Sequence, residues 1–175
     1  MRLFIAINFN PDTRLRLLAV RDELRSYSKG GNFTVPENIH LTLAFLGECT
    51  AEQTAAVKAV MNTIRFEPFP ISINCVGRFK RNDGDLWWMG MAESKPLLKL
   101  QQELSDRLIA NGFTLEKRKY SPHITLGRKV ITSATPWAVK PFGETVNTFE
   151  LMKSERLGGK LIYTSIYELP KRTGN

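Results

Sequence analysis

Apolar residues recur along the chain with two different periods, and these periods divide the sequence into strands and helices. Residues 3–9, LFIAINF, are almost continuously apolar and rich in strand formers, which predicts a buried strand. From Leu17 to Tyr27 the apolar residues lie three or four positions apart, as on one face of a helix. Asn10 is a suitable cap for the start of this helix, and the glycine pair at 30–31 predicts its end.

The same two periods predict two more helices and several more strands. The second helix follows a capping box, Thr50-x-x-Gln53, and has an apolar stripe made of Val57, Val60, Met61 and Ile64. The third begins near Pro96, ends at Asn111-Gly112, and has an apolar face made of Leu97, Leu100, Leu104 and Leu108. The remaining strands are predicted at residues 40–47, 71–79, 85–92 and 121–128, and near 145–153 and 160–168.

The two halves of the chain contain their elements in the same order. The strand at Leu3 begins 37 residues before His40, and the strand at Leu86 begins 37 residues before His123. Each interval contains a strand, an amphipathic helix and a second strand that opens with the motif H-x-T-L. We interpret this agreement as an internal duplication of a strand–helix–strand unit.

The duplication predicts a fold class as well as an order of elements. We expect one bilobal domain over residues 1–175, with approximate repeats at 3–47 and 86–128. The predicted class is α+β, with two pseudo-symmetric lobes of mostly antiparallel sheet and helices on their outer faces. An approximate two-fold axis would bring the two H-x-T-L strands together at a central cleft.

Composition narrows the class of protein further. The apolar content of 42% is that of an ordinary globular protein, no apolar run could span a membrane, and only the tail PKRTGN reads as disordered. The opening MRLFIAINF is too short for a signal peptide, and Cys49 and Cys75 lack the spacing of a disulfide or metal motif. We therefore expect a cytoplasmic protein, monomeric because no long exposed apolar stripe is evident. The net charge of +8 favours a polyanionic partner such as nucleic acid.

The chain has only two histidines, and both of them open an H-x-T-L motif. Side chains alternate between the faces of a strand, so His40 and Thr42 share one face, as do His123 and Thr125. Imidazole titrates near neutral pH, so one ring can accept a proton from water while the other donates one to a leaving oxygen. Threonine hydroxyls can donate to phosphate oxygens. The pair therefore suits displacement at phosphorus.

Other kinds of site fit the sequence less well. A zinc site needs three or four ligands, and these two histidines would need Asp or Glu ligands to complete one. No nucleotide-binding loop of the forms GxxxxGK[ST] or GxGxxG is present. We therefore expect acid/base chemistry that uses no metal and no cofactor.

The motifs resemble those of a known family. Paired H-x-T-L motifs on a duplicated α+β chain look like the two-histidine phosphoesterase superfamily. More narrowly, HLTLAFLG, SPHITLGR and the opening strand LFIAINF are similar to the RNA 2′,3′-cyclic phosphodiesterases, which were first named 2′-5′ RNA ligases. The resemblance extends over nearly the whole chain.

The resemblance implies hydrolysis of a terminal 2′,3′-cyclic phosphate on RNA to a 2′-phosphate, without a metal. It implies that His40 is the proton donor to the 3′ oxygen, that His123 is the base that activates water, and that Thr42 and Thr125 hold the phosphate. The substrate would be RNA with a cyclic phosphate end, tRNA fragments among them, and 2′-5′ RNA ligase activity is a further expectation. Arg128 ends the second match and is a candidate phosphate contact, although simple alternation puts it on the opposite face from His123.

Residues around the motifs could contact the rest of an RNA. Basic residues that could form a rim are Arg78, Lys80, Arg81, Lys117, Arg118 and Lys119. Phe9, Phe45 and Tyr120 could stack on bases, although core packing is the simpler interpretation for each. Two alternatives stay open: a non-catalytic RNA-binding module, and a phosphodiesterase for a small cyclic nucleotide or ADP-ribose cyclic phosphate.

Overall fold

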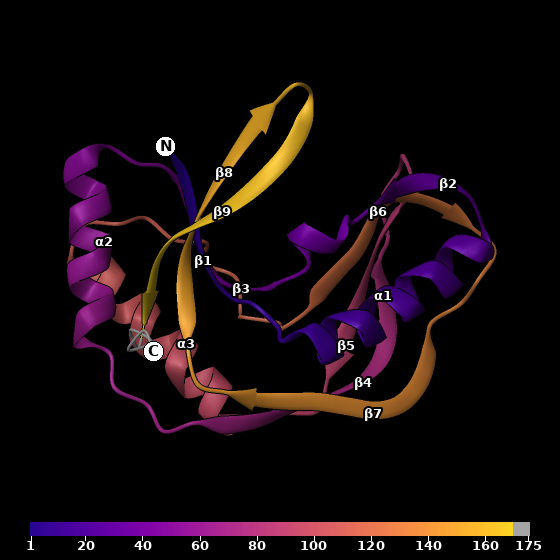
Figure 1. The fold of residues 1–175 in the computed structure, drawn as a ribbon, viewed down its shortest axis with the longest axis horizontal. Coiled ribbons are helices and arrows are strands. Elements are labelled where there is room, and N and C mark those ends of the chain that lie inside the picture. The colour runs from indigo at the N-terminus through magenta and orange to yellow at the C-terminus, as the bar shows by residue number, and fades with distance from the viewer. Residues whose placement is uncertain (170–175) are drawn as a thin grey trace.

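Two antiparallel sheets form the two lobes of the molecule, in a computed structural model that describes residues 1–169 (Figure 1). The first sheet has the strand order β3 (Leu41–Glu48), β1 (Arg2–Ile7), β8 (Phe149–Leu157) and β9 (Lys160–Leu169). The second has the order β2 (Ser28–Phe33), β6 (Ile124–Thr132), β5 (Asp85–Met91), β4 (Phe69–Phe79) and β7 (Trp137–Val146). All of the strand pairings are antiparallel, which confirms the predicted α+β class.

Two of the α-helices begin at the caps that the sequence predicts, and the third is capped by Ser94, which was not predicted. The side chain of Asn10 accepts a hydrogen bond from the backbone of Thr13 at the start of α1 (Pro11–Ser26). Thr50 and Gln53 form a complete capping box at α2 (Ala51–Thr63). The third helix is α3 (Lys95–Ala110), and a single 3₁₀ turn, η1 (Pro36–Asn38), precedes β3. The apolar faces predicted for α2 and α3 are buried throughout.

The helices of the two predicted repeats each lie on the opposite lobe from the strand that precedes them. α1 follows β1 of the first sheet but packs against β2 and β7 of the second. α3 follows β5 of the second sheet but packs against β3 of the first, beside α2 (Figure 1). Each predicted repeat therefore contributes its helix to the other lobe. As a result, each helix packs against the sheet that contains the motif strand of the other repeat.

Three details of the sequence interpretation are wrong or incomplete. The glycine pair at 30–31 does not end the first helix, which stops at Ser26; these glycines lie inside the edge strand β2. Tyr27, expected on the buried face of that helix, is 52% exposed. The strand β7 was not predicted, and the strand expected near 145–153 begins at Phe149.

Other expectations concern membrane spans, cysteines and the tail. Within residues 1–169, no helix has the length and apolar character needed to cross a membrane. Cys49 and Cys75 are free thiols. The tail PKRTGN, residues 170–175, lies outside the described residues.

Candidate active site

His40 lies directly before β3, on the face of the first sheet that carries the rings of Phe4 and Tyr163. Its Nδ1 is 2.7 Å from the carbonyl oxygen of Asn38, and its Nε2 is 2.8 Å from the Thr42 hydroxyl oxygen. Because a carbonyl can only accept, Nδ1 carries a hydrogen, and the Thr42 hydroxyl donates to Nε2 in the neutral ring. The motif therefore fixes the orientation and the tautomer of its own histidine.

His123 lies in the corresponding position before β6 of the second sheet. Its Nδ1 is 2.8 Å from the carbonyl oxygen of Ser121, which again lies two residues earlier in the chain. Among residues 1–169, no hydrogen-bond partner contacts Nε2 of this ring. Both histidines thus turn Nδ1 toward their own backbone. Nε2 of His40 is bound by the threonine of its own motif, whereas Nε2 of His123 is open, so in each ring Nε2 is the nitrogen that can exchange a proton with a substrate.

The two motifs meet where the lobes meet. β3 and β6 contact each other, and the Tyr120 hydroxyl donates a 2.8 Å hydrogen bond to the carbonyl oxygen of Thr42. The charge of His123 acts on His40, because it contributes to the pKa of that ring. Both histidines are partly exposed, so neither ring is sealed inside a lobe.

The pKa of His40 lies below its ordinary value. Burial is the main cause, because it disfavours the charged ring, while the bond to the Asn38 carbonyl acts in the opposite direction. The positive charges of Arg128 and His123 lower the pKa further. In the free protein, His40 therefore favours the neutral form at neutral pH.

The two threonines lie on the same side of their strands as their histidines, and both are partly exposed. Thr42 is paired with Ala6 of β1, and Thr125 is paired with Trp88 of β5. Paired residues in antiparallel strands share a face, so each hydroxyl lies beside the residue opposite. Thr42 therefore lies beside a small, fully buried residue, Ala6, and Thr125 beside a large, partly buried one, Trp88.

Arg128 lies in the cleft region although strict alternation from His123 predicts the opposite face. The pairing of β6 with β5 shifts its register on both sides of Trp87, so alternation does not hold along this strand. Arg128 is exposed, and its charge acts on both His40 and the Tyr163 hydroxyl, whose pKa values it helps to lower. The guanidinium is thus within electrostatic range of the His40 ring and the Tyr163 hydroxyl.

Aromatic rings that sequence reasoning did not identify flank both histidines. The rings of Phe4 and Tyr163 lie 4.9 and 5.3 Å from the His40 ring, measured between centroids. Those of Phe79 and Trp88 lie 5.4 and 6.4 Å from the His123 ring. No sequence pattern points to Tyr163, because its contact depends on the pairing of β9 with β8 at the edge of the first sheet.

The three aromatic residues proposed as stacking surfaces have different environments. Phe9 is buried in the core. Tyr120 is largely buried, which raises the pKa of its hydroxyl, and it is held by the bond to Thr42. Phe45 is 49% exposed, on the same face as its cross-strand partner Phe4. Of the three, only Phe45 offers a ring face to a base.

The proposed basic rim is divided in the structure. Arg78 forms an ion pair with Asp85 and is paired in register with Trp87, which is fully buried, so it lies on the face away from the cleft. The exposed residues that precede the second motif are Lys117, Arg118 and Lys119. Arg118 pairs with Glu116 in that segment.

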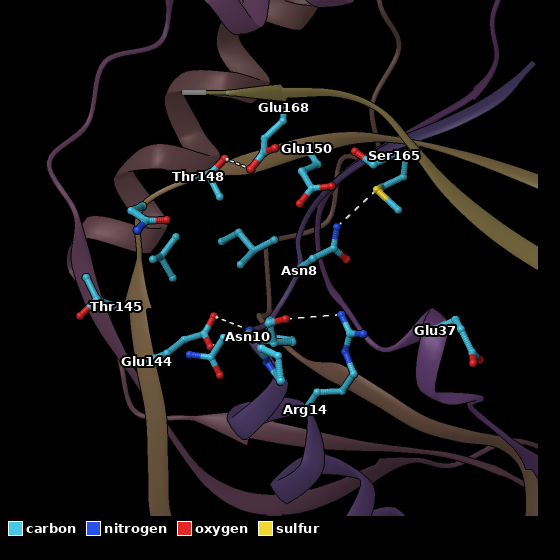
Figure 2. Close-up of a pocket in the computed structure, with 16 residues that line it drawn as sticks. Asn8, Asn10, Arg14, Glu37, Glu144, Thr145, Thr148, Glu150, Ser165 and Glu168 are labelled. Carbon is cyan, nitrogen blue, oxygen red and sulfur yellow. Dashed lines mark hydrogen bonds between the residues drawn. The ribbon is translucent and has the colours of Figure 1, made fainter. Parts of the chain in front are cut away.

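A cavity of about 490 Å³ lies beside the cleft but is not part of it. Figure 2 shows it where β1 leads into α1, bordered by the carboxylates Glu37, Glu144, Glu150 and Glu168. Neither histidine lines it, and clustered carboxylates would repel a phosphate. Within residues 1–169, no group of three or more His, Cys, Asp or Glu side chains is arranged to hold a metal ion.

The fold and the paired motifs define a class, a two-lobed protein with one H-x-T-L histidine from each lobe. Residues 10–156 match the sequence profile of the 2′-5′ RNA ligase superfamily. The chain therefore belongs to the 2′-5′ RNA ligase superfamily.

Individual relatives agree with this assignment. A protein of Archaeoglobus fulgidus named RNA 2′,3′-cyclic phosphodiesterase is 32% identical over 88% of this chain and 91% of its own length. An Escherichia coli protein of the same name is 29% identical over 94% of this chain and 93% of its own length. The crystal structure of E. coli LigT with 3′-AMP has a TM-score of 0.81 at 28% identity, covering 95% of each chain. A Thermus thermophilus structure, TT0787, has a TM-score of 0.82 at 26% identity, covering 96% of each chain.

Proposed function

We propose that this protein hydrolyses the terminal 2′,3′-cyclic phosphate of RNA to a 2′-phosphomonoester, without a metal ion. The observation that carries the proposal is the meeting of two H-x-T-L motifs, one from each lobe, with Nδ1 of each histidine held by its own backbone. Relatives that align over most of the chain and are named RNA 2′,3′-cyclic phosphodiesterase support the same activity.

The proposed reaction is an in-line displacement. His123 accepts a proton from water, and the resulting oxygen forms a new bond to phosphorus. The bond from phosphorus to the 3′ oxygen breaks, and His40 donates a proton to that oxygen, which becomes the 3′-hydroxyl. Thr42, Thr125 and Arg128 donate hydrogen bonds to the non-bridging oxygens and stabilise the charge that develops there.

The proton donor role of His40 needs the substrate. Its lowered pKa in the free protein favours the neutral ring. A bound cyclic phosphate brings a negative charge next to the ring, which raises the pKa and favours the protonated form. Binding and proton loading are therefore coupled at His40.

The same arrangement would catalyse 2′-5′ RNA ligation. The 5′-hydroxyl of a second RNA would take the place of water, lose its proton to His123 and bond to phosphorus. The leaving 3′ oxygen would again be protonated by His40. We expect the protein to act as a cytoplasmic monomer on cyclic-ended RNA such as tRNA fragments.

An assay in EDTA tests the proposal, with an oligoribonucleotide that ends in a 2′,3′-cyclic phosphate. Single substitutions His40→Ala and His123→Ala should each lower kcat by about 10²–10⁴-fold, the usual contribution of a proton-transfer group. The double variant should be no slower than the slower single variant, because the two rings act in one step. Thr114→Ala, at an exposed threonine outside both motifs, is the control for general damage.

Two results would contradict the proposal. One is the absence of ring opening by the unaltered protein, with tight RNA binding that ignores both histidines; this would favour the RNA-binding module. The other is ring opening that survives both substitutions.

A further inference from the structure

One surface next to His40 combines arginines that form no ion pair with two aromatic rings, one exposed and one partly buried. We call it the hairpin face and define it by Arg2, Phe45, Arg156 and Tyr163. The hairpin of β8 and β9 extends beyond the rest of the first sheet, and its tip stands clear of both lobes (Figure 1). None of these four residues is needed for the acid/base step described above, so their arrangement is unexplained by it.

Strand register places the residues of the hairpin face on one side of the sheet. Arg2 is opposite Ser154, and Ser154 is opposite Tyr163, so these three form a row across β1, β8 and β9. Arg156 lies two residues beyond Ser154 on the same strand and therefore shares its face. The row begins beside the active site, because the Tyr163 ring is in edge contact with the His40 ring at 5.3 Å.

A buried side chain holds the hairpin against the segment that carries His40. Asn38 is 8% exposed, and its amide donates a 3.0 Å hydrogen bond to the carbonyl oxygen of Leu161 in β9. The carbonyl of the same residue binds Nδ1 of His40. The hairpin face is therefore a fixed extension of the cleft rather than an independent flap.

The arginines of this face have no carboxylate partners. Within residues 1–169, neither Arg2 nor Arg156 forms an ion pair, and the same is true of Arg128. Glu48 is opposite Arg2 in register but pairs with the amino terminus at 3.4 Å. These positive charges remain available for an anion.

The three arginines act on one point of the surface, the Tyr163 hydroxyl. Burial raises the pKa of this hydroxyl, and the charges of Arg128, Arg2 and Arg156 all oppose that effect. All three charges therefore lie within electrostatic range of this hydroxyl. Arg128 belongs to the motif strand β6 and Arg156 to the hairpin strand β8, so the positive field extends from the active site to the hairpin.

Phe45 adds an exposed planar surface to this field. It is 49% exposed, and the guanidinium of Arg2 lies over its ring at 5.0 Å from the centroid. Alternating cations and exposed aromatic rings are the features that bind single-stranded nucleic acid, with phosphates on the cations and bases on the rings.

We propose that the RNA chain upstream of the cyclic phosphate leaves the cleft across the hairpin face, with backbone phosphates on Arg2 and Arg156 and a base on Phe45. An oligoribonucleotide should therefore be preferred over a free cyclic mononucleotide, which is too short to reach these residues. This proposal rests on the proposed function, because it assumes that the cyclic phosphate lies between the two motifs.

The path of the RNA also bears on which histidine is the acid. In an in-line displacement, water and the leaving oxygen lie on opposite sides of phosphorus. The leaving 3′ oxygen belongs to the ribose, and the ribose carries the rest of the RNA. An RNA that leaves along the His40 side thus puts the leaving oxygen at His40 and the attacking water at His123.

Two double variants with equal loss of charge test the path. Arg2→Gln with Arg156→Gln alters the hairpin face, while Arg16→Gln with Arg25→Gln removes two charges from α1. Arg25 is a matched control because it also lies 5.0 Å over a phenylalanine, Phe33. For each protein, kcat/KM is measured on 2′,3′-cyclic AMP and on a cyclic-ended oligoribonucleotide of about eight nucleotides, over a series of salt concentrations, since phosphate contacts are salt-dependent.

In the hairpin-face variant, the ratio of kcat/KM on the oligoribonucleotide to kcat/KM on the mononucleotide should fall about tenfold. In the α1 variant this ratio should not change. For the hairpin-face variant, the slope of log kcat/KM against log salt on the oligoribonucleotide should be shallower by about 1.4, because two phosphate contacts on a single strand are lost. Phe45→Ala should reduce the same preference by about fivefold or more.

The proposal is overturned if both substrates lose activity equally, if the salt slope does not change, or if the α1 variant behaves like the hairpin-face variant. In each of these cases the ring is still opened, so the proposed function stands. Absence of ring opening on both substrates by the unaltered protein would instead contradict the proposed function itself.

Discussion

At the residue scale, the account depends on how His40 is held and charged. The Asn38 carbonyl fixes Nδ1, and Thr42 contacts Nε2, so the ring has one orientation. Burial and two nearby positive charges keep its pKa below the ordinary value, mostly through burial. A histidine with a low pKa when free, and a higher one beside a phosphate, is loaded with its proton mainly in the complex.

This charge state can be measured in the free protein. The chain has only two histidines, so their NMR signals can be assigned from His40→Ala and His123→Ala. The His40 signal should titrate below about 6.5, and Arg128→Gln should raise its pKa because one opposing positive charge is lost. Arg25→Gln, on α1, should leave it unchanged. A His40 signal at or above the ordinary value, or one that ignores Arg128→Gln, would contradict this account of the ring.

The charge state of His40 also determines the pH dependence of the reaction. If His40 must be protonated, kcat/KM falls as pH rises through its pKa in the free protein, which is below the ordinary value. The bound phosphate raises that pKa, so kcat should fall at a higher pH than kcat/KM does. Parallel pH profiles of the two constants measure this difference, and coincident falling limbs would show that substrate does not load the proton.

Residue-level prediction from the sequence succeeded where alternation holds and failed where it is broken. Alternation alone put His40 and Thr42 on one face, and the structure agrees. It put Arg128 on the wrong face, because the register of β6 shifts beside it. Tyr163 could not be found, because the contact with His40 is made between residues 123 positions apart through the folded hairpin.

At the element scale, the packing of Trp88 against β4 positions a ring beside the second motif. Trp88 lies across β4 over Gly77, where an added Cβ would be only 2.2 Å from the indole. The indole also lies beside His123, with ring centroids 6.4 Å apart. The glycine therefore makes room for the tryptophan that borders the second motif.

Gly77→Ala should force the indole to shift and destabilise the protein by about 1–3 kcal/mol, the usual cost of overpacking. Chemical denaturation measures this free energy of unfolding. Activity should fall as well, because the displaced ring lies beside His123. Gly30→Ala is the control, since an added Cβ there meets no atom within 4 Å. Equal stability of the two variants would contradict the packing role of Gly77.

The elements that the sequence predicted are those with buried apolar faces and clear caps. All three helices were found because their stripes and caps are regular. The two missed strands, β2 and β7, are the outer strands of the second sheet. Edge strands bury little and tolerate Gly and Pro, as at the glycine pair at 30–31 and at Pro141, so they lack the usual apolar pattern.

At the scale of the whole molecule, the two lobes contain equivalent strand pairs, as the predicted duplication requires. β1 with β3 and β5 with β6 are equivalent antiparallel pairs, and an origin by duplication remains a prediction that fits them. The register relates Ile7 to Met89 and Leu41 to Ile124, so the first strands are offset by 82 residues and the motif strands by 83.

The exchange of helices between lobes could not be predicted, because either packing satisfies the same apolar stripes. The net charge of +8 becomes informative only once unpaired arginines are located beside the cleft.

The central claim is that water activated in one lobe displaces an oxygen that is protonated in the other. The most direct test is to open a cyclic-ended oligoribonucleotide in EDTA, in water labelled with a heavy oxygen isotope, and to identify the product. The account predicts a 2′-phosphomonoester that carries one labelled oxygen. A 3′-phosphomonoester, or a product without the label, would contradict it.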